Sequence, residues 1–306
     1  MGIFQNKDQY EGYNIYSMKK YVDKKRIIFT TIIVILIIIT LGFIIYYSVD
    51  TTIRLKSAKR FEQKLIEYES KQEELQKQER ERQAKIPKLT DEGKQNIKGI
   101  YKSETKRVFL TFDDGPSVNT ADVLDILKSN DIKATFFVLG TQVEKMPEMV
   151  KRAYQEGHYI ANHGYSHQYS QIYSSPETVL QEFNQCNSAV AKAIDVPEYN
   201  SHLFRFPGGS VGGKYANLKA EAVTLLEQNN IMHVDWNALT GDAEKSSLDE
   251  EYLMNNLQKT TQNKNSIVIL MHDAQAKKIT AETLPKVIEY LQQQGYSFES
   301  FYDIIK

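Results

Sequence analysis

The hydrophobic residues of this chain follow three successive patterns, of which the first is an unbroken apolar run. From Ile27 to Tyr47 the sequence IIFTTIIVILIIITLGFIIYY contains no charged residue. A helix of this length spans about 31 Å, which matches the hydrocarbon thickness of a bilayer. We therefore expect a transmembrane helix at residues 27–47, preceded by a cytoplasmic tail at residues 1–26.

Two features distinguish this run from a cleaved signal peptide. The run is longer than the apolar core of such a peptide, and the sequence YYSVDTT at its end offers no small-residue cleavage site. Basic residues flank both ends, at 19–26 and at 54–60, so the positive-inside rule favours a cytoplasmic N-terminus by only a small margin. The orientation must therefore follow from the function of the domain beyond the helix.

The second pattern is typical of a polar helix. Residues 48–86 are rich in good helix formers, with apolar side chains at spacings of three and four. The apolar seam consists of Ala58, Phe61, Leu65, Tyr68 and Leu75. Because Glu79 and Arg82 occupy the next positions, the seam is shorter than a coiled coil needs. We expect a solvated helical stalk at 48–86 and a linker at 87–103. The first half of the stalk could also form a homodimer, and the sequence does not decide this.

In the third pattern, from residue 104 to residue 306, short apolar runs alternate with longer helical stretches. Strands are expected at 107–111, 134–138, 159–161, 203–206, 232–234, 266–270 and 297–301. Helices are expected at 119–129, 147–156, 176–194, 218–228, 248–260 and 281–294. This alternation predicts βα units and a parallel sheet, either an open sheet with helices on both faces or a barrel.

Polar segments follow these strands at their carboxyl ends. The segments are TFDDGP after the first strand, NHGYSHQ after the third, RFPGGS after the fourth, DWNALTGD after the fifth and MHD after the sixth. In barrels and α/β sheets, this is the edge on which the loops build binding and catalytic sites. We therefore expect these segments to converge on one site.

The histidines and aspartates of these segments suggest a metal site. His163 and His167 are four residues apart, which places both rings on one face of a helical turn. Two histidines and one aspartate form a three-ligand set that leaves room for water, as in catalytic zinc sites. The adjacent carboxylates of Asp113 and Asp114 repel each other unless a cation is near. One aspartate would bind the ion and the other would act as general base towards a water that the ion activates.

Composition and charge narrow the classes of function. The chain has 306 residues, of which 41% are hydrophobic, so it can bury a large core. Its net charge of −1 combines a basic part up to Lys102, about +7, with an acidic part from Glu104 onward, about −8. The acidic part has no basic stripe, which argues against a nucleic-acid partner. The single cysteine, Cys186, lies in a helical pattern and is expected to be a buried structural thiol.

The motifs TFDDGP, HGYSH, RFPGG, DW and LMHD, in this order over residues 104–306, resemble those of the NodB-homology polysaccharide deacetylases, carbohydrate esterase family 4. The resemblance implies a distorted (β/α)7-type barrel and one divalent metal ion. It also implies hydrolysis of N-acetyl groups on amino sugars. Zinc is the first expectation for the ion, while cobalt, nickel and manganese remain open because two histidines and an aspartate suit all of them.

The resemblance also implies a role for each matching residue. Asp113 resembles the catalytic base, and the metal ligands would be Asp114, His163 and His167. Arg205 resembles the arginine that contacts the base and keeps it ionised. His272 resembles the general acid, and Asp242 the carboxylate that holds this histidine and raises its pKa.

Three further residues would contact the substrate. The N–H of Gly208 would stabilise the oxyanion of the tetrahedral intermediate. Trp236 resembles a wall of the acetyl pocket, with Leu270 as an apolar neighbour. Many family members have an aromatic residue at the position of Gly208, so this chain lacks that side-chain wall. Three other histidines match no motif and are expected to be structural: His158, His202 and His233.

The expected protein is a single-pass membrane protein with an extracellular deacetylase domain at 104–306, acting on an acetylated glycan of the cell wall. Peptidoglycan N-acetylglucosamine is the first choice of substrate. Poly-N-acetylglucosamine or a chitin-like oligomer is the second, and an O-acetyl ester, as in xylan, is the third. The rival hypothesis is a wall-binding or scaffold protein in which catalysis is minor.

Overall fold

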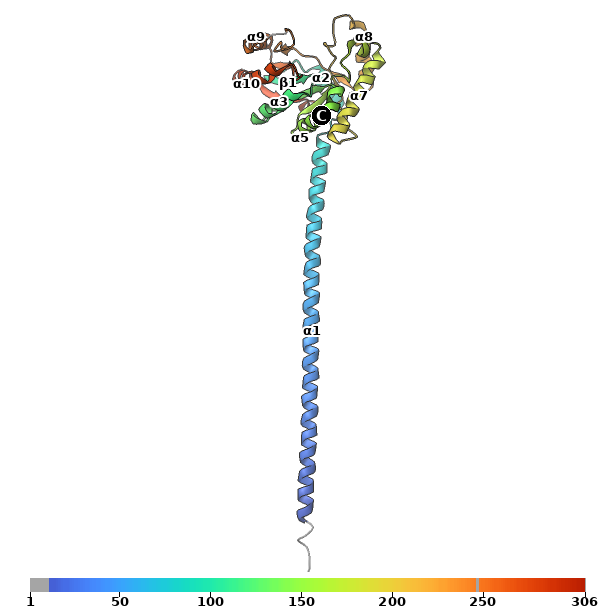
Figure 1. The fold of residues 1–306 in the computed structure, drawn as a ribbon, viewed down its shortest axis with the longest axis vertical. Helices are drawn as coiled ribbons and strands as arrows, with labels where there is room; N and C mark the ends of the chain where they lie inside the picture. Colours follow the sequence, from blue (N-terminus) through green and yellow to red (C-terminus); the bar gives the residue numbers. More distant parts are fainter. Residues whose placement is uncertain (1–10, 246–247, 306) are drawn as a thin grey trace, which may run out of the picture. The chain divides into compact units, whose positions relative to one another are not determined.

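The computed structural model describes residues 11–245 and 248–305 (Figure 1). The first ten residues of the expected cytoplasmic tail lie outside the described residues. The chain consists of two compact units, with the boundary between Glu79 and Arg80. The second unit contains all of the expected catalytic residues.

Helix α1 (Glu11–Ala84) is continuous and contains both the apolar run and the expected stalk. Its apolar side chains between Ile27 and Tyr47 are exposed. Threonine hydroxyls within this run donate to carbonyls one turn earlier, for example Thr40 Oγ1 to Leu36 O at 3.0 Å, so these polar groups are satisfied inside the helix. Among the described residues, α1 is the one helix long and apolar enough to cross a membrane.

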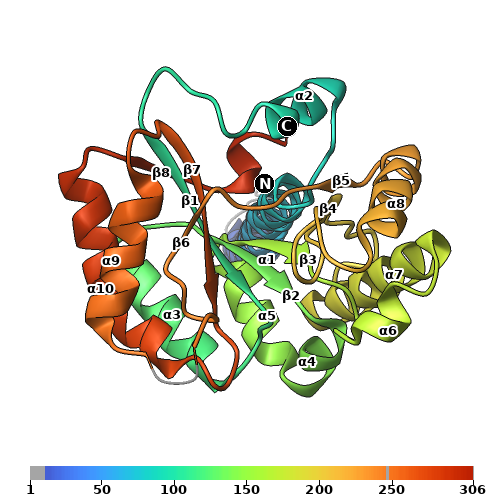
Figure 2. The same ribbon diagram turned by 90° about the horizontal axis from the view of Figure 1, so that it is seen from above.

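The second unit is built on an eight-stranded parallel sheet whose order is β5-β4-β3-β2-β1-β7-β6, with β8 pairing β1 (Figure 2). The strands are β1 (Arg107–Asp113), β2 (Thr135–Val138), β3 (Tyr159–Asn162), β4 (Leu203–Phe204), β5 (Met232–His233), β6 (Ala238–Leu239), β7 (Ser266–His272) and β8 (Ser297–Glu299). Within the described residues β5 and β6 do not pair, so the expected barrel is a curled sheet that stays open. The parallel βα architecture is confirmed.

The larger helices of this unit match the expected ones within three residues at each end. They are α3 (Val118–Ser129), α5 (Pro147–Gln155), α7 (Pro176–Ile194), α8 (Ala216–Gln228), α9 (Glu250–Thr261) and α10 (Lys278–Gln293). Figure 2 shows α3, α5, α9 and α10 along one side of the sheet. Each is amphipathic, and burial of its apolar face is what fixes it on the sheet.

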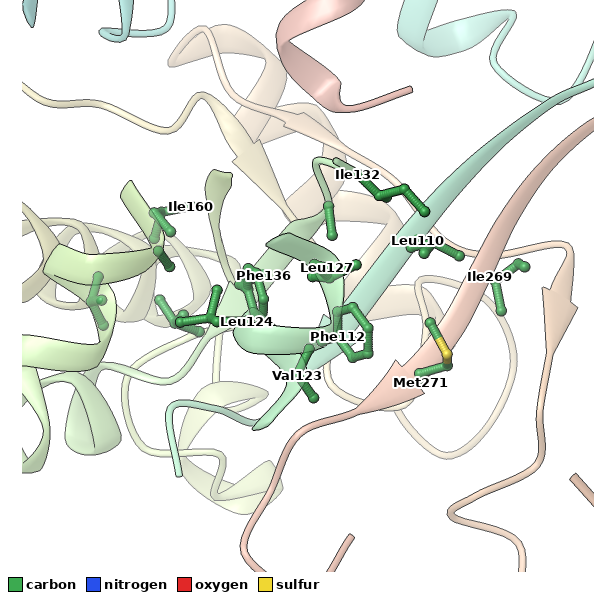
Figure 3. Close-up of a cluster of buried hydrophobic side chains, with 14 of the residues drawn as sticks. Leu110, Phe112, Val123, Leu124, Leu127, Ile132, Phe136, Ile160, Ile269 and Met271 are labelled. Carbon is green, nitrogen blue, oxygen red and sulfur yellow. The ribbon is translucent and has the colours of Figure 1, made fainter. Parts of the chain in front are cut away.

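Alternation along β1 sorts its side chains between two faces. Leu110 and Phe112 belong to the hydrophobic cluster shared with the helix layer, where Phe112 stacks on Phe136 (Figure 3). Phe109, on the opposite face, packs against Phe301 inside the curl of the sheet. Thr111 and Asp113 share the face of Phe109, so the period of the strand points Asp113 into the interior.

The segment expected to be a linker contains helix α2 (Asp91–Lys98). Its N-cap is Thr90, whose side chain accepts a hydrogen bond from Gly93 N–H at 3.0 Å. Ile97 and Ile100 are buried in the cluster that also contains Phe109 and Phe301. The two isoleucines of this otherwise polar segment thus cover one side of the core. For this reason the compact unit begins before residue 104, the expected boundary.

Other short elements also escaped the sequence analysis. These are α4 (Gly140–Lys145), α6 (Tyr169–Ile172), β6 and the 3₁₀ helix η1 (Phe301–Asp303). The strand expected at 297–301 ends at Glu299, and η1 follows it. Elements of two to six residues are too short to show a hydrophobic period. Their conformations depend on the neighbours against which they pack.

Burial of Ile100 predicts that Ile100→Ala lowers the free energy of unfolding of the 80–306 unit by about 2–5 kcal/mol, because the substitution leaves a cavity between α2 and the sheet. Urea denaturation followed by circular dichroism measures this. Val118→Ala, at an exposed position, is the matched control and should cost about 0.5 kcal/mol or less. Equal stability of the Ile100→Ala variant and the wild type would show that α2 is not part of the core.

Candidate active site

The candidate site lies where β1 and β7 end together. The strand register pairs Asp113, the last residue of β1, with His272, the last residue of β7. Neighbouring strands are about 4.8 Å apart, so the backbones of these two residues are fixed side by side. The structure therefore brings the expected base and the expected acid to one edge of the sheet.

Arg205 fills the interior behind Asp113. Its side chain is fully buried, at 0% exposure, and its guanidinium lies 3.9 Å from the centroid of the Phe137 ring. Nη1 donates to Asp113 Oδ1 at 2.8 Å and to Thr111 Oγ1 at 2.7 Å. Nε and Nη2 donate to the carbonyls of Val234 and Asp235, at 3.2 Å and 3.1 Å. The guanidinium is held in one orientation and offers its charge to Asp113.

This pairing determines the charge of Asp113. Burial raises the pKa of the Asp113 carboxyl, and the adjacent Arg205 charge acts against that rise. An arginine is always protonated, so an uncharged Asp113 would leave a buried cation unpaired. The arrangement favours an ionised carboxylate that accepts a proton only when chemistry supplies one.

Asp114, His163 and His167 form a second group beside Asp113. Asp114 Oδ1 lies 3.5 Å from His163 Nε2 and 3.4 Å from His167 Nε2. One ligand atom from each of the three residues lies within 4.8 Å of the others, which is the spacing that a metal ion needs. Asp114 Oδ1 is buried and accepts no hydrogen bond within the described part of the chain. Such an orphaned oxygen between two imidazoles fits a bound cation.

His163 is prepared for this role by its surroundings. Its Nδ1 makes a 2.8 Å hydrogen bond with the carbonyl of Arg205, which places the proton on Nδ1 and directs the Nε2 lone pair towards Asp114. Burial lowers the pKa of His163 to about 3, so the ring is neutral. A neutral imidazole is the form that binds a metal ion.

The two histidines meet without the helical turn that their spacing predicted. His167 has a left-handed backbone, with φ of 58°, and the segment between the histidines is a loop. The buried carboxylate of Glu182, on α7, accepts hydrogen bonds from Tyr165 N–H at 2.6 Å and Ser166 N–H at 2.7 Å. It also accepts one from the Ser166 hydroxyl at 2.7 Å. Glu182 thereby folds the loop so that the two rings lie 5.5 Å apart.

His272 is held by Asp242. Its Nδ1 lies 2.9 Å from Asp242 Oδ1, and its backbone N–H donates to Asp242 Oδ2 at 2.7 Å. The Thr280 hydroxyl donates to the same oxygen at 2.8 Å, so the buried carboxylate has all the partners it needs. Burial lowers the pKa of His272, but the hydrogen bond and charge of Asp242 outweigh this and raise it to about 9. His272 therefore carries a proton at neutral pH.

The expected substrate-contacting residues lie around these groups. Gly208 has φ of 75°, and its N–H donates to no acceptor among the described residues. The next residue, Gly209, faces Trp236: a side-chain carbon built there would lie 3.4 Å from the indole ring. Leu270 is partly exposed on the same face of β7 as His272. A contact of Leu270 with Trp236 remains a prediction.

The remaining histidines and Cys186 are not among the three ligand residues that the described part of the chain brings together. His158 is buried, its Nδ1 accepts from Ala134 N–H, and burial lowers its pKa to about 4. His202 is bound to the carbonyl of Asn230, and His233 lies edge-on to Phe206. Cys186 is fully buried, and burial raises its pKa. The prediction of a buried thiol is confirmed.

Sequence reasoning assigned no role to three residues of this site, although one of them, Asp273, ends the motif LMHD. Asp273 is buried, accepts from the Thr120 hydroxyl at 2.5 Å and packs against Gly115. Burial raises its pKa to about 7. Glu182 carried a signal, because it lies on the buried face of α7 between Val179 and Cys186, where a carboxylate needs a partner. Tyr169, beside Gly208, carried none, because α6 is too short to be recognised.

The chain is similar to known deacetylases over this unit. Residues 101–225 match the protein family described as polysaccharide deacetylase. YheN of Bacillus subtilis is 36% identical over 198 residues, which cover 63% of this chain and 66% of that protein. A peptidoglycan-N-acetylglucosamine deacetylase of Bacillus cereus is 33% identical over 205 residues, which cover 65% and 71%. The structure of a Streptococcus mutans CE4 esterase has a TM-score of 0.62 at 30% identity, over 68% of this chain and 90% of that one.

The chain therefore belongs to the polysaccharide deacetylases of carbohydrate esterase family 4. It is a hydrolase of amide bonds that acts on an acetylated glycan, and enzymes of this family use a divalent metal ion. The family, fold and reaction class expected from the five motifs are confirmed. The matched part of the two curated relatives is about two thirds of their length, 66% and 71%.

Glu182 offers a test of how the loop is held. Glu182→Ala removes the acceptor of three hydrogen bonds and should weaken binding of a divalent ion about 10- to 100-fold, as losses of supporting groups around metal ligands do. Calorimetric titration with zinc measures this affinity. Gln181→Ala, exposed on the same helix, is the matched control and should leave it unchanged. Unaltered affinity in a folded Glu182→Ala variant would contradict this role.

The Asp242–His272 pair predicts a titration. A pKa raised above that of the unfolded chain means that protonated His272 stabilises the fold below pH about 6.5 and loses this effect as pH rises through about 9. NMR titration of the imidazole should give a midpoint near pH 9 in the wild type. Asp242→Asn should move the midpoint downward, because the charge is lost. An unchanged midpoint would contradict the assigned interaction.

Proposed function

We propose that this chain removes N-acetyl groups from N-acetylglucosamine residues of peptidoglycan, with a zinc ion held by Asp114, His163 and His167. The observation that carries this proposal is the single cluster at the ends of β1 and β7. In it, a buried Asp113–Arg205 pair adjoins a three-residue metal-binding group and an Asp242-bound His272. Amide hydrolysis needs a base, an acid and an electrophile, and this cluster supplies a group for each.

Zinc is proposed on the chemistry of the donor set. Two imidazole nitrogens and one carboxylate oxygen are ligands that zinc accepts in catalytic sites, and they leave a position open. When bound, such an ion lowers the pKa of water and polarises a carbonyl group. Cobalt, nickel and manganese accept the same ligands, so metal replacement is the way to rank them.

Asp113 is proposed as the general base. Its Oδ1 is occupied by Arg205, while Oδ2 lies 3.7 Å from His163 Nε2, on the side of the metal-binding group. Oδ2 is thus the oxygen that would take the proton from an attacking water. Arg205 keeps the carboxylate ionised before this step and fixes its direction.

Gly208 is proposed to stabilise the oxyanion. Its N–H has no acceptor within the described protein and lies in a loop fixed on both sides. Lys219 Nζ donates to the carbonyl of Gly209 at 2.7 Å, and Tyr173 donates to that of Pro207 at 2.7 Å. A donor held in place before the reaction is worth more than one that must reorient.

His272 is proposed as the general acid. Attack of water on the acetyl carbon forms a C–O bond, and cleavage of the C–N bond then needs a proton on the departing nitrogen. The imidazolium of His272, with its pKa raised to about 9 by Asp242, supplies that proton. The products are acetate and a free amine on the sugar.

The choice of glycan rests on relatives and on the N-terminal helix. Similar proteins of Bacillus cereus and Listeria monocytogenes are named peptidoglycan-N-acetylglucosamine deacetylases. An apolar helix at 27–47 would anchor the chain in the membrane, and wall glycan lies on the extracellular side. We therefore propose a cytoplasmic N-terminus and an extracellular catalytic unit. Exposed Phe61 and Tyr68 on α1 would support a homodimer through the stalk.

The proposal predicts metal-dependent acetate release from purified peptidoglycan. EDTA should abolish release, and zinc should restore it. Asp113→Asn should lower kcat about 10²- to 10⁴-fold, the usual contribution of a general base, with zinc content unchanged. Asp122→Asn, exposed on α3, is the matched control and should retain activity. Release of acetate from O-acetyl esters alone would contradict the proposed amide substrate, and full activity of Asp113→Asn would contradict the assigned base.

A further inference from the structure

Gly208 leaves a space that a side chain from another loop fills. A carbon placed at its Cβ position would lie 2.8 Å from the hydroxyl of Tyr169 and 3.4 Å from two atoms of its ring. Tyr169 is the first residue of α6, 39 positions earlier in the chain. The glycine and the tyrosine are therefore complementary, because a larger residue at 208 would collide with Tyr169.

The position of Tyr169 is fixed by two aromatic neighbours. Its ring packs edge-on to His167 at 5.6 Å between centroids and edge-on to Tyr173 at 5.7 Å. The hydroxyl of Tyr173 in turn donates a hydrogen bond to the carbonyl of Pro207, the residue before Gly208. Tyr169 is thus held between the proposed metal ligand His167 and the proposed oxyanion donor Gly208.

Tyr169 also has an exposed part. Tyr169 is 41% exposed. Its hydroxyl makes no hydrogen bond with the described residues. The other tyrosine of this pair, Tyr173, is buried and bonded. An aromatic ring with an available hydroxyl suits a pyranose, whose C–H groups pack on the ring and whose hydroxyls pair with the polar end.

We propose that Tyr169 forms the wall of the sugar subsite beside the reacting acetyl group, in place of a side chain at position 208. This inference rests on the proposed function and names the residue that selects a glycan over a small acetyl compound. Tyr169 packs on the ring of the N-acetylated sugar equally before and during the reaction, so its contribution is to the binding of the glycan. It contacts substrate without taking part in proton transfer.

The test compares two substrates with the full chain in detergent micelles, loaded with zinc. Tyr169→Ala should raise KM for a tetramer of N-acetylglucosamine at least tenfold, while kcat changes less than threefold. For p-nitrophenyl acetate, which has no sugar, kcat/KM should stay within twofold. Tyr252→Ala, on α9, is the matched control: its hydroxyl bonds Glu244, and its loss should affect neither substrate. An unchanged KM, or equal losses on both substrates, would overturn the inference.

Binding is measured separately from turnover. Trp236 is the single tryptophan of the chain and lies beside Gly209, so its fluorescence reports a sugar in the site. Weaker binding of the tetramer by Tyr169→Ala than by the wild type would support the inference. If the wild type bound the tetramer but released no acetate, that result would contradict the proposed function and leave the inference standing. Equal binding by variant and wild type would overturn the inference.

The juxtaposition itself has an independent test in stability. Gly208→Ala forces a methyl group towards the Tyr169 hydroxyl, so it should lower Tm more in the wild type than in the Tyr169→Phe background. The strain of a positive φ is common to both backgrounds and cancels in the comparison. Equal Tm shifts would overturn the placement of Tyr169 beside Gly208.

Discussion

The buried guanidinium of Arg205 is the interaction on which the site depends. Its side chain pairs with Asp113, and its own carbonyl fixes the tautomer of His163, so one residue orients both a carboxylate and a histidine. Removing one partner of such a buried pair costs about 3–5 kcal/mol, because the other charge is left without compensation. The ring of Phe137 and the carbonyls of Val234 and Asp235 hold the guanidinium of Arg205 in a single position. The interior of the curled sheet thus holds a charge pair instead of a purely apolar core, and the reactive edge is built on it.

Buried carboxylates repeat this principle around the site. Asp242 holds His272, and Glu182 holds the loop between the two metal-side histidines. Each accepts several hydrogen bonds, so its charge is stabilised without exposure to water. The imidazoles are therefore placed by groups that are themselves fixed. A site organised in this way needs little rearrangement when substrate and metal bind, which is the condition for electrostatic catalysis.

The sequence predicted the parallel βα architecture and the family, because long amphipathic helices and buried strands have clear periods and five motifs fall at strand ends. It predicted that His163 and His167 would meet, but for the wrong reason: their loop is shaped by Glu182 and a left-handed His167, neither of which a spacing of four reveals. Helix α2 and Tyr169 were missed because their roles come from distant partners. Ile100 is buried against residues some 200 positions later, and Tyr169 matters only beside Gly208.

We propose that Asp114, His163 and His167 form the metal centre of this deacetylase. Crystals of the 80–306 unit grown with zinc, with diffraction measured on both sides of the zinc absorption edge, would locate the ion. We expect one strong anomalous peak within about 2.0–2.2 Å of a carboxylate oxygen of Asp114 and of Nε2 in both histidines. A peak bound by other residues, or none at this position in zinc-loaded crystals, would contradict it.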